Sequence, residues 1–345
     1  MSGKPRGRIT KIINAVAPCR ICDEGGWTDT WFALIGMILN FCIYPFVEVQ
    51  IVVRECRKRR ITLYLENFQS SYDYELGSGY DKNPLIEAAL EMVPIPENVH
   101  LEISIHSQMP PGASTGSSAA LVVALIGALD ALTPGRLAAA EVARLAHEVE
   151  TLKLRQQSGI QDQLAAAFGG INFIEMREFP HGVVSPIKLP DSLWWELERR
   201  FCLVYVGKPH NSSKVHEEVI EKLGSHAKNN PHMVALRRIA SQAKDALCSG
   251  DFRLFGEAMN ANTREQEAMH PALVNPQFHN IIDISKEFGC VGAKVNGAGG
   301  DGGTVTLLTN GLMPQKRQME AKLVNAGYQV IPIYLARQGL RVWVQ

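Results

Sequence analysis

The first half of the chain shows the alternation of apolar and polar residues that is typical of half-buried strands. We predict strands over residues 9–17, 47–53, 61–65 and 101–105, with a polar, turn-rich segment over 70–83. A loop rich in glycine and serine, residues 110–118, then leads into an apolar stretch that predicts a helix over 119–132. A second helix is predicted over 136–154, where Ala139, Ala143, Ala146 and Glu150 share one face.

The second half alternates shorter strands with amphipathic helices. We predict a strand over 201–206, helices over 216–223, 231–249, 251–263 and 276–288, and strands over 293–296, 304–308, 329–334 and 340–344. Proline and glycine cluster over 179–191, which we interpret as a domain boundary. The order of elements predicts an α+β protein with two domains, residues 1–185 and 186–345.

Composition narrows the class of protein. The 345 residues carry 35 basic and 35 acidic side chains, so the net charge gives no indication of nucleic-acid binding. Hydrophobic residues make up 46%, which is ordinary for a globular enzyme. The seven cysteines are an odd, scattered set that favours free thiols and a cytoplasmic location. Cys19 and Cys22 have CxxC spacing without a second pair, and we interpret them as small residues near a buried strand.

Two segments could suggest a membrane. Residues 1–11 are basic but lack the cleavage pattern of a secretory signal. Residues 31–53 are long and mostly apolar, yet Asn40, Pro45, Glu48 and Gln50 interrupt them, and 47–51 alternate as a strand does. We therefore predict no membrane span.

The loop over 110–118 is the first candidate for chemistry. Glycines and small hydroxyl residues before a helix leave its first N–H groups uncrowded, which suits phosphate oxygens. The loop lacks the lysine that ends a Walker A sequence. Taken alone, the pattern fits simple capping by Ser117 and Ser118 equally well.

The glycine-rich segment over 297–303 contains a GxGxxG pattern. A dinucleotide fingerprint requires a helix after the glycines, whereas 304–308 is β-branched and strand-like. We therefore predict a glycine turn between two strands, which permits close approach of another backbone.

Two carboxylates form the third candidate. Asp162 lies twelve residues beyond Glu150 and begins a short predicted helix, so that both could come from adjacent elements. A carboxylate there could orient a hydroxyl or bind a cation, or could simply cap the helix.

Together these segments resemble the GHMP kinase superfamily, over nearly the whole chain. The resemblance rests on 17–29, 110–120 and 297–303, which occur in the family's order. It implies a ribosomal-protein-S5-like N-terminal domain, a ferredoxin-like C-terminal domain, and the use of ATP and Mg2+. Residues 36–40 and 159–170 look most like D-glycero-D-manno-heptose 7-phosphate 1-kinases, while the variant over 25–29 also occurs in fucokinase-like enzymes. Ser114, Thr115 and Asp301 depart from the family's pattern, which puts nucleotide affinity and preference in doubt.

The resemblance also implies a role for each matching residue. Asp162 would be the catalytic carboxylate, with Arg20 beside it to neutralise developing charge. Ser118 and Glu150 would hold Mg2+. The phosphates of ATP would lie on Pro111, Gly112, Ala113, Ser114, Thr115, Gly116, Ser117 and Ser118. The sugar would contact Gly26, Trp27, Asp29, Gly299 and Gly300, and a distal phosphate would contact Lys208 and His210. Trp27 could equally fill the core, and the charged loop near Lys208 could simply be solvated.

The implied reaction transfers the γ-phosphoryl group of ATP to the anomeric hydroxyl of a sugar or sugar phosphate, most closely the heptose 7-phosphate. Two alternatives stay open: a kinase for an unphosphorylated sugar, and a sensor that binds sugar and nucleotide without catalysis. The expected partner is a small-molecule sugar. The residues leave the oligomeric state open, a homodimer included.

Overall fold

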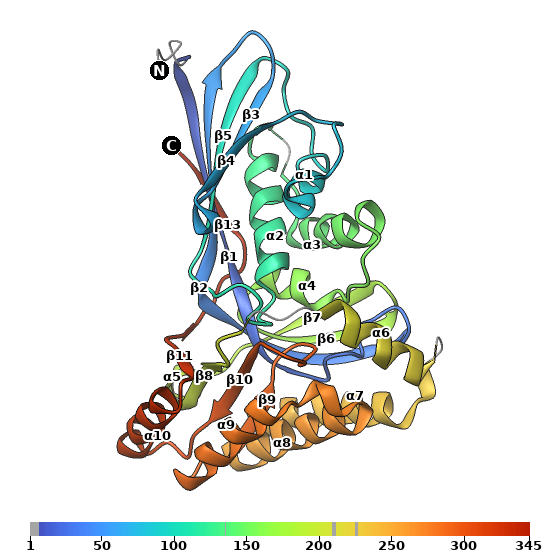
Figure 1. Cartoon of the computed structure of the whole chain (residues 1–345), viewed down its shortest axis with the longest axis vertical. Coiled ribbons are helices and arrows are strands. Elements are labelled where there is room, and N and C mark those ends of the chain that lie inside the picture. Colours follow the sequence, from blue (N-terminus) through green and yellow to red (C-terminus); the bar gives the residue numbers. More distant parts are fainter. Residues whose placement is uncertain (1–6, 135, 209–211, 225–226) are drawn as a thin grey trace.

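A computed structural model describes residues 7–134, 136–208, 212–224 and 227–345. Within them, the chain forms a nine-stranded sheet and a four-stranded sheet, each covered by helices (Figure 1). The mixed architecture confirms the predicted α+β class.

The nine-stranded sheet is built on two long strands, β1 (Ile9–Glu24) and β2 (Gly36–Glu55). Its main path runs β13-β1-β2-β5-β3-β4. The other strands of that path are β3 (Arg60–Leu65), β4 (Ser70–Tyr74), β5 (Val99–Ser107) and β13 (Arg341–Val344). The β2 strand pairs with β5 along its second half and with β6 (Ile171–Glu178) along its first, and β6 in turn pairs with β7 (His181–Ile187). One continuous strand thereby joins both parts of the sheet.

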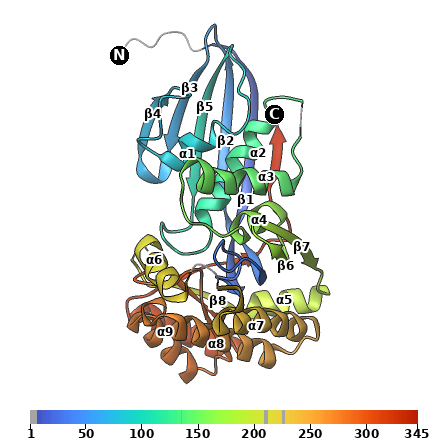
Figure 2. The same cartoon turned by 90° about the vertical axis from the view of Figure 1, so that its right-hand side faces the viewer.

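Helices cover one face of this sheet, as Figures 1 and 2 show. The central one, α2 (Ser117–Asp130), is buried from Ala119 to Leu129 except at Leu121, because it lies between the sheet and other helices. Its neighbours are α1 (Pro84–Ala89), α3 (Ala139–Glu148), a π-helical turn η2 (Val149–Lys153) and α4 (Gln161–Phe168). The glycine- and serine-rich loop therefore precedes a helix that is held in place by packing against the sheet and the neighbouring helices.

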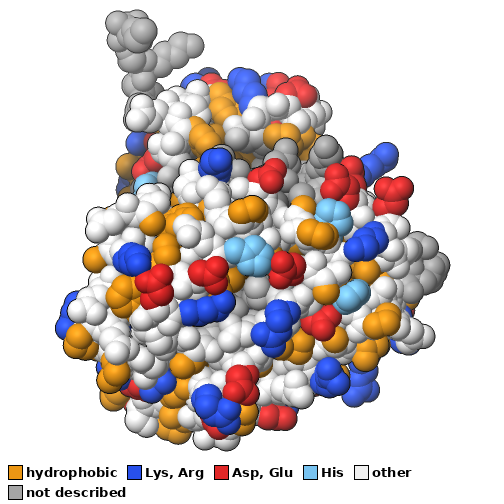
Figure 3. All heavy atoms as spheres, turned by 60° about the horizontal axis from the view of Figure 1, so that its bottom comes forward, with side chains coloured by type: hydrophobic (Ala, Val, Ile, Leu, Met, Phe, Trp, Pro, Cys, Tyr) orange, Lys and Arg blue, Asp and Glu red, His pale blue; other side chains and the backbone are white. Residues whose placement is uncertain are grey.

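The smaller sheet is antiparallel, with strand order β11-β8-β10-β9. Its strands are β8 (Phe201–Tyr205), β9 (Gly292–Val295), β10 (Thr304–Leu308) and β11 (Gln329–Ile331). The helices of this half are α5 (Asp191–Arg200), α6 (Ser212–Leu223), α7 (Pro231–Cys248), α8 (Phe252–Met269), α9 (Pro276–Glu287) and α10 (Met313–Asn325). Basic and acidic side chains lie interspersed on the face that Figure 3 presents.

Three buried aromatic rings connect the two halves. The ring centroid of Phe41 on β2 lies 5.3 Å from that of Phe201 on β8 and 5.6 Å from that of Phe255 on α8, in edge-to-face geometry. These residues belong to one apolar core that extends across both sheets. Groups placed at the junction of the two halves are thus held by packed side chains on both sides.

Several elements differ from the sequence prediction. The segment 70–74 is strand β4, because it pairs with β3. The helix predicted over 136–154 changes at Val149 into the π-helical turn. Residues 36–53, part of the apolar membrane candidate, belong to strand β2, and none of the described helices is both long and apolar enough to cross a bilayer. Cys19 and Cys22 are buried free thiols in β1, as expected.

The chain end returns to the first sheet. Strand β12 (Tyr334–Leu335) pairs with β2, and β13 pairs with β1. The division at residue 185 falls inside β7, which belongs to the large sheet. The two-domain boundaries stay a prediction, but the sheets do not divide at that point, since strand pairing joins segments far apart in sequence.

Candidate active site

A cavity of about 460 Å³ lies where the two halves meet. Its walls come from the end of β1 and the turn after it, the loop before α2, the η2–α4 region, and the glycine turn before β10. The predicted site residues among its lining are Arg20, Trp27, Asp29, Gly112, Ser114, Thr115, Gly116, Ser117, Ser118, Glu150 and Asp162. The fold thus brings together most of the residues that the sequence indicated.

The loop before α2 presents an open helix start to this cavity. Its N-cap is Gly116 in the left-handed conformation, with φ +68°, and no side chain caps the helix. A Cβ at Gly116 would lie 3.2 Å from the carboxylate of Asp162, so glycine permits the close approach. Since Ser117 and Ser118 do not act as the N-cap, the first N–H groups of the helix are available to an anion.

Arg20 and Asp162 form a bidentate ion pair at the cavity wall. Arg20 Nε lies 2.7 Å from Asp162 Oδ1, and Nη2 lies 3.1 Å from Oδ2. Arg20 Nη1 also donates to the carbonyl oxygen of Ser114, at 2.5 Å. Burial alone would lower the pKa of Arg20, but the carboxylates of Asp162 and Asp23 outweigh it and raise that pKa. The arginine therefore stays charged and ties the carboxylate to the loop.

Asp29 lies in the turn after β1 and is 3% exposed. Its Oδ2 accepts a hydrogen bond from the backbone N–H of Gln161, at 3.0 Å. Burial raises the pKa of Asp29 to about 6. Trp27 is also buried and packs on Phe32 at 6.3 Å between centroids, so that it fills core and lines the cavity at once.

Glu150 is the second buried carboxylate of the lining. It accepts hydrogen bonds from the Ser158 hydroxyl and from Gln163 Nε2, the latter at 2.9 Å. Burial raises the pKa of Glu150 to about 7, and the nearby Asp162 carboxylate adds to the rise. No ion pair to Glu150 occurs within the described ranges, so a bound cation would supply its missing counter-charge. Hydroxyl and carboxylate oxygens are the donors that Mg2+ prefers. Ser118 and Glu150 both line the cavity and offer such oxygens, and their joint role as ligands stays a prediction.

The glycine turn is only partly in the cavity. Gly297 and Ala298 line it, whereas Gly299 and Gly300 do not and instead pack against 273–275. Asp301 is exposed and is not among the lining residues. Sugar contacts by Gly299 and Gly300 stay a prediction.

The remaining predicted contacts lie at the margin. Gly26, Pro111 and Ala113 adjoin lining residues but are not among them. Lys208 is exposed beyond the end of β8 and does not line the cavity. His210 lies outside the described residues.

The cavity lining also includes polar residues that the sequence did not indicate, among them Asp23, Ser158 and Gln161. Asp23 gave only a weak signal, because it lies between Arg20 and Glu24 at the polar end of β1. Ser158 and Gln161 gave none, because their partners are distant in sequence or in another element.

Comparisons with known proteins agree with this architecture. The GHMP kinase N-terminal domain matches residues 83–170, and the GHMP kinase C-terminal domain matches residues 243–324. A D-glycero-alpha-D-manno-heptose 7-phosphate kinase of Campylobacter jejuni is 28% identical over 85% of this chain and 88% of its own length. A mevalonate kinase of Pyrococcus furiosus is 26% identical over 86% of this chain and 85% of its own length. The structure of a D-glycero-D-manno-heptose 1-phosphate kinase from Bacteroides thetaiotaomicron superposes with a TM-score of 0.75, covering 96% of this chain and 98% of the other at 23% identity.

The chain therefore carries the N-terminal and C-terminal domains of the GHMP kinases, and its two packed halves have the fold of that family. Within that family it is similar to heptose phosphate kinases as well as to mevalonate kinases.

Proposed function

We propose that this protein transfers the γ-phosphoryl group of ATP to the anomeric hydroxyl of a sugar or sugar phosphate, with D-glycero-D-manno-heptose 7-phosphate as the leading substrate. The observation that carries the proposal is the bidentate Arg20–Asp162 pair facing a cavity beside an open helix N-terminus. Similarity to the Campylobacter heptose 7-phosphate kinase supports the choice of sugar.

In this mechanism, Asp162 accepts the proton of the attacking hydroxyl, and the two hydrogen bonds from Arg20 orient its carboxylate. The N–H groups at the start of α2 bind the nucleotide phosphates. Mg2+, held by Ser118 and Glu150, would neutralise charge on those phosphates. Asp29 accepts hydrogen bonds from sugar hydroxyls. No covalent intermediate is needed, because positioning and charge stabilisation suffice for phosphoryl transfer.

A kinase for an unphosphorylated sugar is the second candidate. Among the lining residues that the structure describes, Arg20 alone is basic, and it is already paired with Asp162. A distal phosphate would require a second basic site, which the lining does not supply. As far as the described lining goes, this observation favours a neutral sugar, while residues 209–211 of the predicted phosphate-binding loop lie outside the described ranges.

The test is an ADP-release assay with Mg-ATP and a substrate panel: the heptose 7-phosphate, mannose, fucose, galactose, their terminal phosphates, and mevalonate. Asp162→Asn is expected to lower kcat by about 10²–10⁴, the range for loss of a general base. Nucleotide affinity should stay within about threefold by calorimetry, because Asn keeps the size of the side chain.

The matched control is Asp191→Asn, which removes an exposed carboxylate paired with Arg337 away from the cavity. Turnover on the heptose 7-phosphate alone would establish the lead substrate, and turnover on a free sugar would establish the second candidate. Binding of ATP and sugar without turnover would identify a sensor. Loss of binding in Asp162→Asn with unchanged turnover per bound enzyme would contradict the catalytic role.

A further inference from the structure

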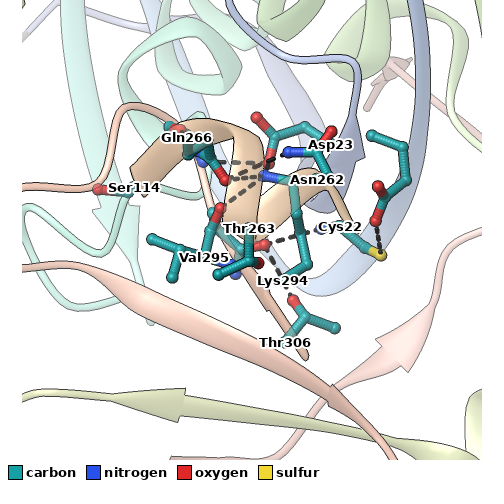
Figure 4. Close-up of polar contacts among 12 residues, drawn as sticks. Cys22, Asp23, Ser114, Asn262, Thr263, Gln266, Lys294, Val295 and Thr306 are labelled. Atoms are coloured by element: carbon teal, nitrogen blue, oxygen red, sulfur yellow. Dashed lines mark hydrogen bonds and ion pairs between the residues drawn. The ribbon is translucent and has the colours of Figure 1, made fainter. Parts of the chain in front are cut away.

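A fully buried lysine lies behind the active site. Lys294 on β9 has a side chain that is 0% exposed, and its ammonium contacts three oxygens. They are Asp23 Oδ1 at 3.3 Å, Gln266 Oε1 at 3.1 Å and the carbonyl oxygen of Val295 at 2.5 Å (Figure 4). All three donors of the ammonium are thus used. Because burying a charge is costly, such an arrangement calls for a specific role.

Two of these partners hold the same glycine. Asp23 Oδ1 accepts the N–H of Gly297 at 3.0 Å, and Gln266 Nε2 donates to the carbonyl oxygen of Gly297 at 2.9 Å. The backbone N–H and the carbonyl oxygen of Gly297 are therefore both hydrogen-bonded. Its conformation is left-handed, with φ +61°, and it is the first residue of the glycine turn.

Gly297 in turn lies against the predicted catalytic pair. A Cβ at this position would be 3.4 Å from Arg20 Nη2 and 3.2 Å from the carbonyl oxygen of Ser114. That carbonyl is the one that accepts from Arg20 Nη1. The glycine backbone thus forms the wall behind the guanidinium, and whatever fixes Gly297 limits where Arg20 can lie.

We propose that Lys294 is a positioning residue: together with Asp23 and Gln266 it clamps Gly297 against Arg20, and so sets the Arg20–Asp162 geometry from the other sheet. This inference rests on the proposed phosphoryl transfer and adds a residue to it. Lys294 touches neither the cavity nor the reacting atoms, and it acts through Asp23 and Gly297.

The charges around Asp23 make the role measurable by pH. Lys294 faces it from β9, while Arg20, Cys22 and Glu24 come from its own strand β1 and Asp29 from the following turn. Burial alone would raise the pKa of Asp23, but Lys294 and Arg20 hold it below its usual value. Without Lys294, burial and the neighbouring acids would raise the pKa of Asp23, and the protonated acid would hold Gly297 less well.

The experiment compares Lys294→Met with the wild-type full chain, using kcat and KM for ATP and sugar between pH 6 and 9. We expect kcat at pH 7 to fall by at least about tenfold, with KM for ATP changed by less than about threefold. We also expect kcat of the variant to recover as pH rises and Asp23 ionises. The double variant Lys294→Met/Asp23→Asn should lose that recovery and regain most of kcat, since the amide oxygen of Asn only accepts, whereas a protonated Asp23 can turn its hydroxyl toward the N–H of Gly297.

The matched control is Lys316→Met, which removes a largely buried lysine that donates to the carbonyls of Arg199 and Phe201, away from the cavity. It should leave kcat and its pH profile unchanged. The positioning role is refuted if kcat of Lys294→Met stays within twofold of the wild-type value. It is also refuted if kcat falls but depends on pH as it does in the wild type. If that variant does not fold, the double variant decides, because kcat more than tenfold below wild type there would also refute it.

Failure of the proposed function can be told apart from failure of this inference. If the proposed function is wrong, the wild-type protein turns over no substrate of the panel. In that case, a crystal structure of Lys294→Met tests the clamp without turnover. Displacement of Gly297 from Arg20 is expected, and an unchanged turn would overturn the inference.

Discussion

Replacing Arg20 by lysine tests how much of the site depends on the geometry of its charge. The guanidinium makes two hydrogen bonds to Asp162 and one to the carbonyl oxygen of Ser114. Lysine keeps the positive charge but cannot present a planar fork, so we expect it to lose one carboxylate contact and the loop contact. Arg20→Lys therefore keeps the positive charge but loses the directed hydrogen bonds of the guanidinium.

The expected magnitude follows from those two contacts. Hydrogen bonds to charged groups contribute about 1.5–3 kcal/mol each, and a rate falls tenfold for each ~1.4 kcal/mol. Because water replaces part of the two lost hydrogen bonds, we expect kcat of Arg20→Lys to fall by about 10²–10³. This fall is similar to that caused by the loss of one preorganised donor in other enzymes. The free energy of unfolding should fall by about 1–3 kcal/mol, because Asp162 keeps a cationic neighbour.

The assay is steady-state ADP release with the accepted substrate, together with urea unfolding of the same preparations. Arg200→Lys is the matched control, since Arg200 pairs with Glu196 at 2.7 Å and stacks on Phe252 at 4.4 Å, away from the cavity. The reasoning is refuted if Arg20→Lys keeps kcat within threefold of the wild type. It is also refuted if Arg200→Lys lowers kcat as much.

Two further predictions concern a buried acid and a tight turn. Because burial raises the pKa of Asp29 to about 6, kcat/KM for the sugar should fall as pH drops from 7 to 5, where the carboxylate gains a proton and loses its charge-assisted hydrogen bonds to sugar hydroxyls. At saturating Mg2+, Asp29→Asn should abolish this fall of kcat/KM between pH 7 and 5. If the fall is unchanged in the variant, a group other than Asp29 causes it. Gly299→Ala should lower the free energy of unfolding by more than about 3 kcal/mol, since its Cβ would lie 2.0 Å from the carbonyl oxygen of Leu273. Gly327→Ala shares the positive φ but meets nothing within 4 Å, so it should cost only about 1–2 kcal/mol in urea unfolding, and equal losses in the two variants would disprove the steric argument.

The sequence indicated most elements by local pattern, because alternation and helical periodicity are properties of neighbouring residues. The strand over 304–308 has the predicted bounds, and the apolar helix after the glycine-rich loop begins within two residues of its predicted start. The π-helical turn at Val149 was not predictable in this way, since it depends on what packs against it. The same holds for the return of β12 and β13 to the large sheet.

For the site, the residue types and their order along the chain were enough to propose a phosphate loop, a carboxylate and an arginine. Tertiary structure alone decided which of them meet. Arg20 and Asp162 are 142 positions apart, and Asp23 and Lys294 are 271 apart, so no local pattern relates them. Their contacts arise because β1 runs from the large sheet into the junction where β9 and the glycine turn pack, and only burial there gives an ion pair the desolvated surroundings that fix its geometry. Local sequence specified the parts of this kinase, and long-range packing specified their distances and their charge states.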